Sequence, residues 1–218
     1  MANTSNPFGA RQFGMREGSA PTAGFDRMFI SSGYTGPVFT GDCVMASTTA
    51  PYVVSANSTT GGVANGITVP FTGVFMGCKY YNASLNRTVW NSYWPGSGAT
   101  GDVEAYVCTN PEQLYIVQGS TGGVLGTSVV GFVVPMSITN SSLGNTTTGQ
   151  SVATVQSSLV TGLSTAGHFK IVDVYSNYAP PGVNGTSTTS EGWQIVVVQP
   201  VNTQRRTQNQ GMTVAFTT

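Results

Sequence analysis

Short blocks rich in Val, Ile, Phe and Tyr, each ended by turn residues, constrain the fold of this chain more than any other feature. They recur from residue 27 onward, and clusters such as Gly33–Gly36 and Pro180–Gly182 separate them. Such clusters break helices and permit tight turns. The blocks predict strands at Arg27–Ile30, Val38–Met45, Tyr52–Ala56, Gly73–Tyr81, Val103–Cys108, Gln113–Gln118, Val129–Met136, Phe169–Tyr175 and Trp193–Gln199.

Partial alternation of apolar and polar residues within the blocks predicts sheets with one buried face. The runs Gln113–Gln118 and Phe169–Val174 show it. All-β domains extend to roughly 200–250 residues as one unit, so 218 residues fit one β-barrel or β-sandwich domain. The residues we expect to point inward are Val44, Phe75, Val107, Ile116, Phe132, Ile171 and Val196.

The sequence predicts three segments: an extended N-terminal arm (residues 1–26), a β domain (27–200) and a C-terminal tail (201–218). The arm lacks strand periodicity, and its aromatic and arginine side chains are effective interface anchors. We therefore expect it to lie across a neighbouring subunit. The tail ends in the apolar run Met212–Phe216, which could pair with a neighbour's sheet edge or pack on its own barrel. The anchors of the arm are Phe8, Arg11, Phe13, Arg16 and Phe25.

Two stretches depart from the strand pattern. Between Val152 and Leu163, apolar residues recur with helical spacing, but β-branched and hydroxyl residues lower the helix propensity. A short helix there is the less favoured alternative. The polar stretches 57–62 and 140–150 predict solvated loops.

The chain is poor in charge. Charged residues make up 7% of it, against about 25% in an average soluble domain. The net charge of zero gives no field that would steer the protein to nucleic acid or anionic lipid. It also leaves little electrostatic protection against association. We expect a structural or binding protein, with no direct nucleic-acid or membrane partner.

Candidate catalytic groups are scarce. His168 is the single histidine, and no Gly-x-Ser-x-Gly elbow supplies a nucleophile, so a histidine in a loop or at a strand edge is the favoured interpretation. Asp102 and Glu104 alternate at a strand start and could face one side, as glycosidase carboxyls do. Neighbours along one strand are more often a solvated face. We expect no enzymatic activity.

The cysteines Cys43, Cys78 and Cys108 are odd in number and lie in separate apolar blocks. They lack the spacing of a metal site, and the first residues show neither the basic start nor the apolar core of a secretion signal. We expect buried free thiols, no metal and no cofactor.

A cluster of aromatic residues lies between residues 80 and 94 among Asn and Ser. Three interpretations stay open: a β-hairpin whose rings pack on the core, a subunit interface, and a glycan-binding platform. We include Trp90, Tyr93 and Trp94 with the arm residues in the candidate interface. The full cluster is Tyr80, Tyr81, Trp90, Tyr93 and Trp94.

Several runs give residues 6 to 199 their overall character: Asn6–Gly9, Gly41–Val44, Gly73–Cys78, Trp90–Gly96, Asp102–Val107 and Asn110–Gln118. Together they resemble head structural proteins of tailed bacteriophages. The resemblance implies a capsid decoration, or cement, protein without catalytic residues, which binds the outside of the assembled head and reinforces it. The implied partners are the major capsid protein and neighbouring copies of the chain, with a homotrimer as one arrangement.

The implied location is the capsid surface of a virion assembled in the host cytoplasm. Two alternatives remain open. One is a virion receptor-binding or glycan-binding module that uses the aromatic cluster, and the other is a tail structural protein. Copy number separates a decoration protein from a receptor-binding protein. A decoration protein covers the whole head, whereas a receptor-binding protein is present in a handful of copies on the tail.

Overall fold

The computed structural model describes residues 6–18, 24–48, 51–56, 71–120, 125, 129–137, 144–156, 167–175, 193–201 and 203. Within these ranges the chain is all-β and contains no α-helix. The predicted fold class is confirmed: several antiparallel sheets build a sandwich or barrel-like domain.

The strands are β1 (Arg11–Met15), β2 (Asp26–Ile30), β3 (Val38–Phe39), β4 (Cys43–Ala46), β5 (Val53–Ser55), β6 (Gly73–Asn82), β7 (Arg87–Asn91), β8 (Tyr93–Trp94), β9 (Val103–Cys108), β10 (Gln113–Gln118), β11 (Val133–Val134), β12 (Met136–Ser137), β13 (Gly144–Asn145), β14 (Gln150–Ser151), β15 (Thr154–Val155), β16 (Phe169–Val174) and β17 (Ile195–Pro200).

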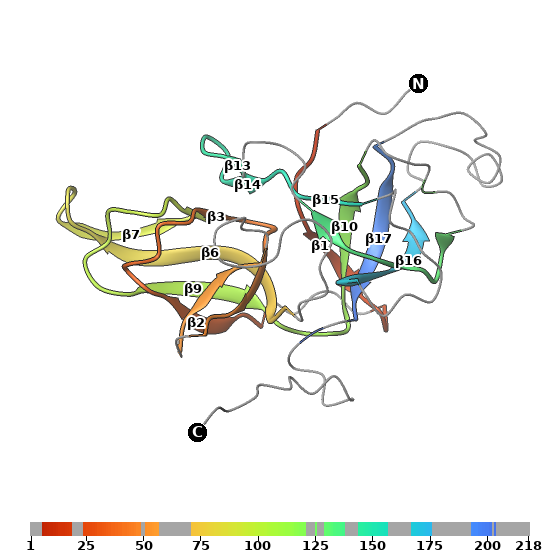
Figure 1. The fold of residues 1–218 in the computed structure, drawn as a ribbon, viewed down its shortest axis with the longest axis horizontal. Helices are drawn as coiled ribbons and strands as arrows, with labels where there is room; N and C mark the ends of the chain where they lie inside the picture. Colours follow the sequence, from red (N-terminus) through yellow and green to blue (C-terminus); the bar gives the residue numbers. More distant parts are fainter. Residues whose placement is uncertain are drawn as a thin grey trace.

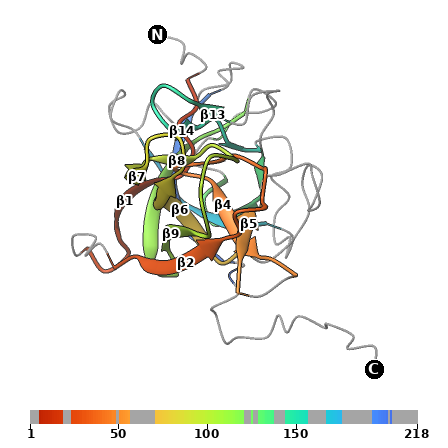
Figure 2. The ribbon, with the colours of Figure 1, turned by 90° about the vertical axis from the view of Figure 1, so that its left-hand side faces the viewer.

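Two large sheets lie at opposite ends of the long axis (Figure 1). The first, here the β10 sheet, has the order β1-β10-β17-β16-β11. The second, the β6 sheet, has the order β2-β9-β6-β4-β5, and β7 pairs with the C-terminal half of β6, from Cys78 to Asn82. Figure 2 looks along the long axis at the β6 sheet, where β7, β6, β9 and β2 follow one another from top to bottom. The pairs β3-β8, β12-β15 and β13-β14 form small sheets.

Each predicted strand overlaps an observed one, but two predicted strands are split. The block 38–45 divides into β3 and β4 because a turn intervenes, with Gly41 at φ 94°. The block 129–136 reduces to β11 and the start of β12, separated by Pro135. Proline has no N–H to donate to a sheet ladder, which explains the interruption.

Two apolar clusters fill the interior. The first joins the inner face of the β10 sheet to residues at one end of the β6 sheet, such as Cys43 and Val74. The second lies on the other face of the β6 sheet and includes Trp94 of β8 together with Phe75 of β6. Val74 and Phe75, adjacent in β6, therefore enter different clusters. At this end both faces of the sheet are buried, which explains its continuous apolar runs.

The predicted inward residues are confirmed at Val44, Phe75, Val107, Ile171 and Val196, which are fully buried. Ile116 and Phe132 are only half-buried, so their prediction is wrong. In β10 the residues that point inward are Tyr115 and Val117. Since successive side chains of a strand point to opposite faces, Ile116 lies on the outer face.

Residues 1–26, predicted as an extended arm without strand periodicity, contain a paired strand in their described part. Residues 11–15 form β1, which pairs with β10 within the chain's own sheet, and Asp26 begins β2. The register of β1 shifts between Gln12 and Gly14, so Phe13 forms a β-bulge. A bulge breaks the period of two, and this is why the sequence pattern did not reveal the strand.

One further prediction is corrected, and two other stretches can be compared with the structure in part. The stretch 140–150, predicted as a solvated loop, contains the hairpin β13–β14 in its described part. In the stretch where a short helix was the less favoured alternative, Val155 belongs to β15, whereas Leu159 and Leu163 lie outside the described residues. In the tail, Thr203 is buried and forms a bridge with Phe71. The polar stretch 57–62 and the run Met212–Phe216 lie outside the described residues.

Candidate binding surfaces

The outer face of the β6 sheet carries an exposed group of aromatic and charged side chains. We call it the aromatic platform and define it by Arg27, Lys79, Trp90, Glu104 and Tyr106. Strand register aligns them, since Lys79 of β6 stands between Trp90 of β7 and Glu104 of β9. Side chains opposite each other on one face of a sheet are close enough to interact.

Trp90 is 69% exposed, although tryptophan is highly buried on average. Its ring stacks on Tyr106 with centroids 5.4 Å apart and planes 8° from parallel. The two residues belong to β7 and β9, which β6 separates. The residue of β6 opposite Tyr106 is Gly77, and a Cβ at Gly77 would meet the backbone of Asn91 and Ser92.

Charged groups border the stacked rings. The Glu104 carboxylate lies 3.4 Å from the Arg27 guanidinium and 3.8 Å from the Lys79 ammonium. The Tyr106 hydroxyl donates a hydrogen bond of 3.0 Å to Glu104. Partial burial, with this hydrogen bond next in importance, raises the pKa of Tyr106. The Lys79 ammonium also lies 5.2 Å from the centre of the Trp90 ring, a cation–π distance.

The aromatic cluster predicted from the sequence divides between the core and the surface. Trp94 is fully buried, contacts Tyr80 edge to face at 5.3 Å, and donates its indole N–H to the Tyr34 carbonyl. Its assignment to an interface is therefore wrong, because the ring fills the core. Tyr93 is half-buried and stacks on Phe39 at 5.1 Å. Of the three rings we placed at the interface, Trp90 is the one with its ring mostly in solvent.

Sequence reasoning missed Tyr106 and Lys79 as surface partners of Trp90. A signal was present in β9, where Glu104 and Tyr106 alternate with Val103 and Ala105. This alternation places the acid and the tyrosine on one outer face. Their proximity to Trp90 depends on the order of strands in the sheet, which the alternation does not contain.

The outer face of the β10 sheet carries a second surface, an open apolar groove of about 320 Å³. Phe13 is 48% exposed at one side of it and contacts Tyr175 edge to face at 5.6 Å. The one charged lining residue, Asp173, accepts a hydrogen bond from the Val174 N–H at 2.8 Å. The lining residues are Phe13, Leu114, Val172, Asp173, Val174, Tyr175 and Val197.

The other candidate interface residues of the arm have different surroundings. Arg11 is exposed, and the exposed Arg16 donates a hydrogen bond of 3.1 Å to the side chain of Gln199 in β17. Phe8 is half-buried, and Phe25 packs against the first apolar cluster. Of these aromatic residues, Phe13 is therefore the one most open to a partner.

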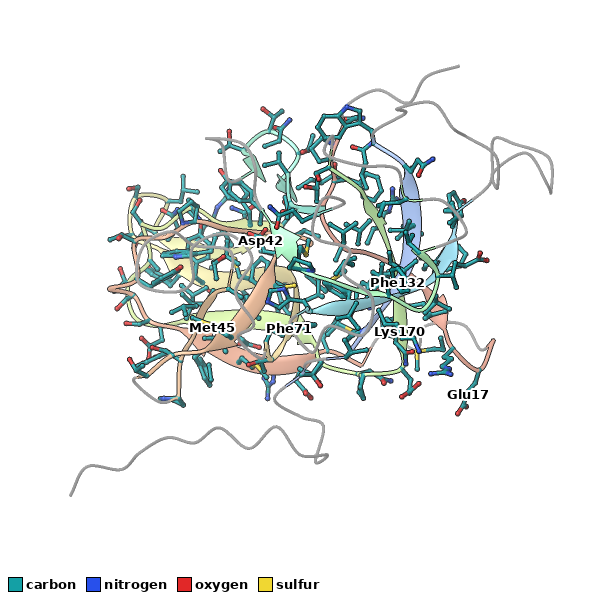
Figure 3. All side chains as sticks on the ribbon, turned by 45° about the vertical axis from the view of Figure 1, so that its right-hand side comes forward. Glu17, Asp42, Met45, Phe71, Phe132 and Lys170 are labelled. Atoms are coloured by element: carbon teal, nitrogen blue, oxygen red, sulfur yellow. The ribbon has the colours of Figure 1, made fainter. Side chains whose placement is uncertain are left out.

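A buried carboxylate, not singled out from the sequence, lies in the turn between β3 and β4. Asp42 is 1% exposed, accepts a hydrogen bond of 2.8 Å from the Phe39 N–H, and accepts another from the Ser151 hydroxyl of β14. The adjacent Gly41 carbonyl accepts from the Ala10 N–H. Figure 3 shows Asp42 and Phe71 in the middle of the molecule. The turn thus ties the N-terminal segment, β14 and the β6 sheet together.

The remaining candidates for chemistry are engaged with structural neighbours. His168 is buried just before β16, where its Nδ1 accepts a hydrogen bond of 3.2 Å from the Met136 N–H. Asp102 accepts a hydrogen bond of 3.0 Å from Tyr52, which raises the pKa of Tyr52. Glu104 instead belongs to the platform, so the structure gives the two carboxylates separate partners.

Cys43, Cys78 and Cys108 are free and buried, as predicted. Burial raises the pKa of Cys78 to about 12 and that of Cys43 well above its usual range. In the described part of the chain, His, Cys, Asp and Glu side chains form no group of three or more that could hold a metal ion. Among the same residues, no helix is long and apolar enough to span a membrane.

Comparison with known proteins adds no relative. Neither protein-family models, nor curated proteins, nor solved structures gave a match to this chain.

Proposed function

We propose that this chain is a virion structural protein that binds the outside of a phage capsid and stabilises it by bridging major capsid protein subunits. The observation that carries the proposal is the apolar groove of the β10 sheet, in which Phe13 is 48% exposed. The sequence runs that resemble phage head proteins support it from a separate direction.

The lining of the groove favours a protein partner. Cores of protein interfaces are depleted in charge and enriched in aromatic residues, and Asp173 is the one charged residue among the lining residues. Apolar contacts depend weakly on salt, because screening acts on exposed charges. Such docking suits a particle that meets varied ionic strength.

Bridging also requires a contact at some distance from the groove. The β6–β7 hairpin projects at the end of the molecule opposite the β10 sheet (Figure 1). It carries Leu85, which is 54% exposed, and Tyr81, which is 42% exposed. We infer that the groove and this hairpin contact different capsid subunits. Many copies of a weak bridge then act together on one shell.

Particles with and without this chain test the proposal. Stripped particles should release DNA at a lower temperature than intact ones, and purified chain should restore them. A Phe13→Asp variant should fail to restore them, because it places a charge in the groove. The matched control is Trp90→Ala, which removes an exposed ring from the other sheet and should restore stability fully. Circular dichroism and thermal melting establish that both variants are folded.

Two outcomes would contradict the proposal. Stripped particles that withstand heat and osmotic shock like intact ones, but fail to adsorb to cells, would favour the receptor-binding alternative. Rings formed by the isolated chain, together with a location in the tail, would favour a tail structural protein. A particle reconstruction separates these cases, since a decoration protein should cover the head in many copies.

A further inference from the structure

We propose that the aromatic platform is a binding site for a pyranose saccharide, with Trp90 as its stacking surface. The inference stands independently of the capsid-binding proposal, which rests on the other sheet. It begins with the exposure of Trp90, a large apolar ring left 69% in solvent.

The two faces of the Trp90 ring have different surroundings. Tyr106 stacks on one of them in near-parallel geometry. The Lys79 ammonium lies over the ring at 5.2 Å from its centre, and the residue as a whole stays 69% exposed beside these two neighbours. A flat, solvated indole face matches the face of a pyranose ring that carries C–H groups, while the hydroxyls of the sugar project around its rim. Tryptophan and tyrosine, like the pyranose ring, combine an apolar face with a polar group at the rim.

Charged groups lie where those hydroxyls would need partners. Lys79 is 37% exposed at its side chain and Arg27 is 72% exposed. An ammonium has three donors and a guanidinium five. Arg27 contacts the Glu104 carboxylate, and Lys79 contacts this carboxylate and the Trp90 ring. Donor capacity thus remains for sugar oxygens, and Glu104 can accept from a hydroxyl.

The same charges disfavour a protein in this place. Lysine and glutamate are depleted at interface cores, and covering Lys79 and Glu104 with a protein would desolvate both. A small polar ligand can stack on the rings and replace the lost water with its own hydroxyls. The groove of the β10 sheet has a different lining, in which five of the seven residues are Phe, Leu or Val and one, Asp173, is charged.

The charges also disfavour single-stranded nucleic acid, which combines stacking with a continuous cationic groove. Glu104 contacts both Arg27 and Lys79 and offsets half of their charge. The whole chain has a net charge of zero. Stacking is available at the platform, but the extended positive field for a phosphate backbone is not present there.

Strand pairing and side-chain contacts hold the platform in place in the absence of a ligand. Strand pairing on both sides of β6 fixes the backbones of Trp90 and Tyr106. Their stacking and the hydrogen bond from Tyr106 to Glu104 hold the rings. A site that is already ordered loses less conformational entropy on binding.

Saturation-transfer NMR on the purified full chain tests the proposal. The probes are the methyl glycosides of glucose, galactose, mannose and glucuronic acid at millimolar concentrations. We expect at least one of them to bind, with the strongest saturation at its ring C–H protons. Trp90→Ala should weaken binding by about tenfold or more, the order expected for one stacked ring. Trp90→Phe should retain part of the affinity.

Phe13→Ala is the matched control, because it removes an exposed ring from the β10 sheet and should leave glycoside binding unchanged. Lys79→Ala should weaken binding while leaving the fold intact. The proposal is overturned if no glycoside binds, or if Trp90→Ala binds as well as the wild-type chain. Binding of oligothymidylate that depends on Trp90 and falls with salt, in the absence of glycoside binding, would also overturn it. Loss of capsid binding in Phe13→Asp bears on the capsid proposal alone.

Discussion

The indole of Trp90 rests on the phenol ring of Tyr106, although the two residues lie on strands that do not pair with each other. The contact crosses β6, whose Lys79 is paired with Trp90 and whose Gly77 is paired with Tyr106. Three strands therefore have to be in register for this surface to exist. The platform is a property of the folded sheet, and local sequence alone does not create it.

The two tryptophans of the aromatic cluster should differ strongly in their effect on stability. Trp94→Ala removes a fully buried ring and an indole hydrogen bond, so the free energy of unfolding should fall by about 3–5 kcal/mol. Trp90→Ala removes an exposed ring and one stacking contact, and should cost about 1 kcal/mol or less. Equilibrium denaturation in urea measures both, and equal losses would contradict this assignment.

Gly77 should resist substitution more than a typical strand glycine. Its φ is 145°, and a Cβ there would lie 3.1 Å from the Asn91 carbonyl oxygen. Gly77→Ala should lower the free energy of unfolding by about 1 kcal/mol or more. It should also change the fluorescence of Trp90. The control is Gly14→Ala in β1, where a Cβ would meet nothing within 4 Å; an equal effect at both positions would contradict the strain expected at Gly77.

Asp42 should be important for stability because its carboxylate is buried and accepts hydrogen bonds from Phe39 and Ser151. Asp42→Asn replaces one acceptor oxygen with a donor group, and the mismatch should cost about 1–3 kcal/mol. Asp102→Asn, at an exposed carboxylate, is the matched control and should cost less than about 1 kcal/mol. Chemical denaturation of the two variants tests the difference.

The cysteines should be unreactive in the folded protein. Burial raises the pKa of Cys78 to about 12 and that of Cys43 well above its usual range, so neither forms thiolate near neutral pH. The thiolate is the reactive form. A thiol-specific reagent at pH 8 should therefore label these two slowly in the native state and rapidly after denaturation. Fast native labelling of Cys78 would contradict the buried geometry.

The same thiols predict a loss of stability in alkali. A proton is held more tightly by Cys78 in the folded chain, with a pKa of about 12, than in the unfolded chain, where the pKa is 9.0. The stabilisation is fully present below pH 9 and is lost as the pH rises toward 12, at up to about 1.4 kcal/mol per pH unit for each such group. Cys43 and Tyr115, whose pKa values burial also raises, act in the same direction. Denaturation between pH 8 and pH 11 should show the decline; a flat profile would contradict it.

Alternation and turn chemistry indicated the strands, because they are local properties. The block Val103–Cys108 illustrates this, since its apolar residues recur every second position and the observed strand has the same bounds. The buried thiols could also be predicted, because the apolar context of each cysteine lies beside it in the sequence. The bulge at Phe13, by contrast, hid β1 from a pattern that assumes an unbroken period of two.

The sequence by itself determined that this chain is all-β, where most of its strands lie, and that its thiols are reduced and buried. Only the tertiary structure decided that Trp94 enters the core while Trp90 faces solvent, and that Tyr115, not Ile116, points inward. The physical reason is that side chains alternate between the two faces of a strand, and this alternation does not show which face another layer of the protein covers. That choice depends on which strands pair and which sheets pack, and these contacts join residues far apart in the chain.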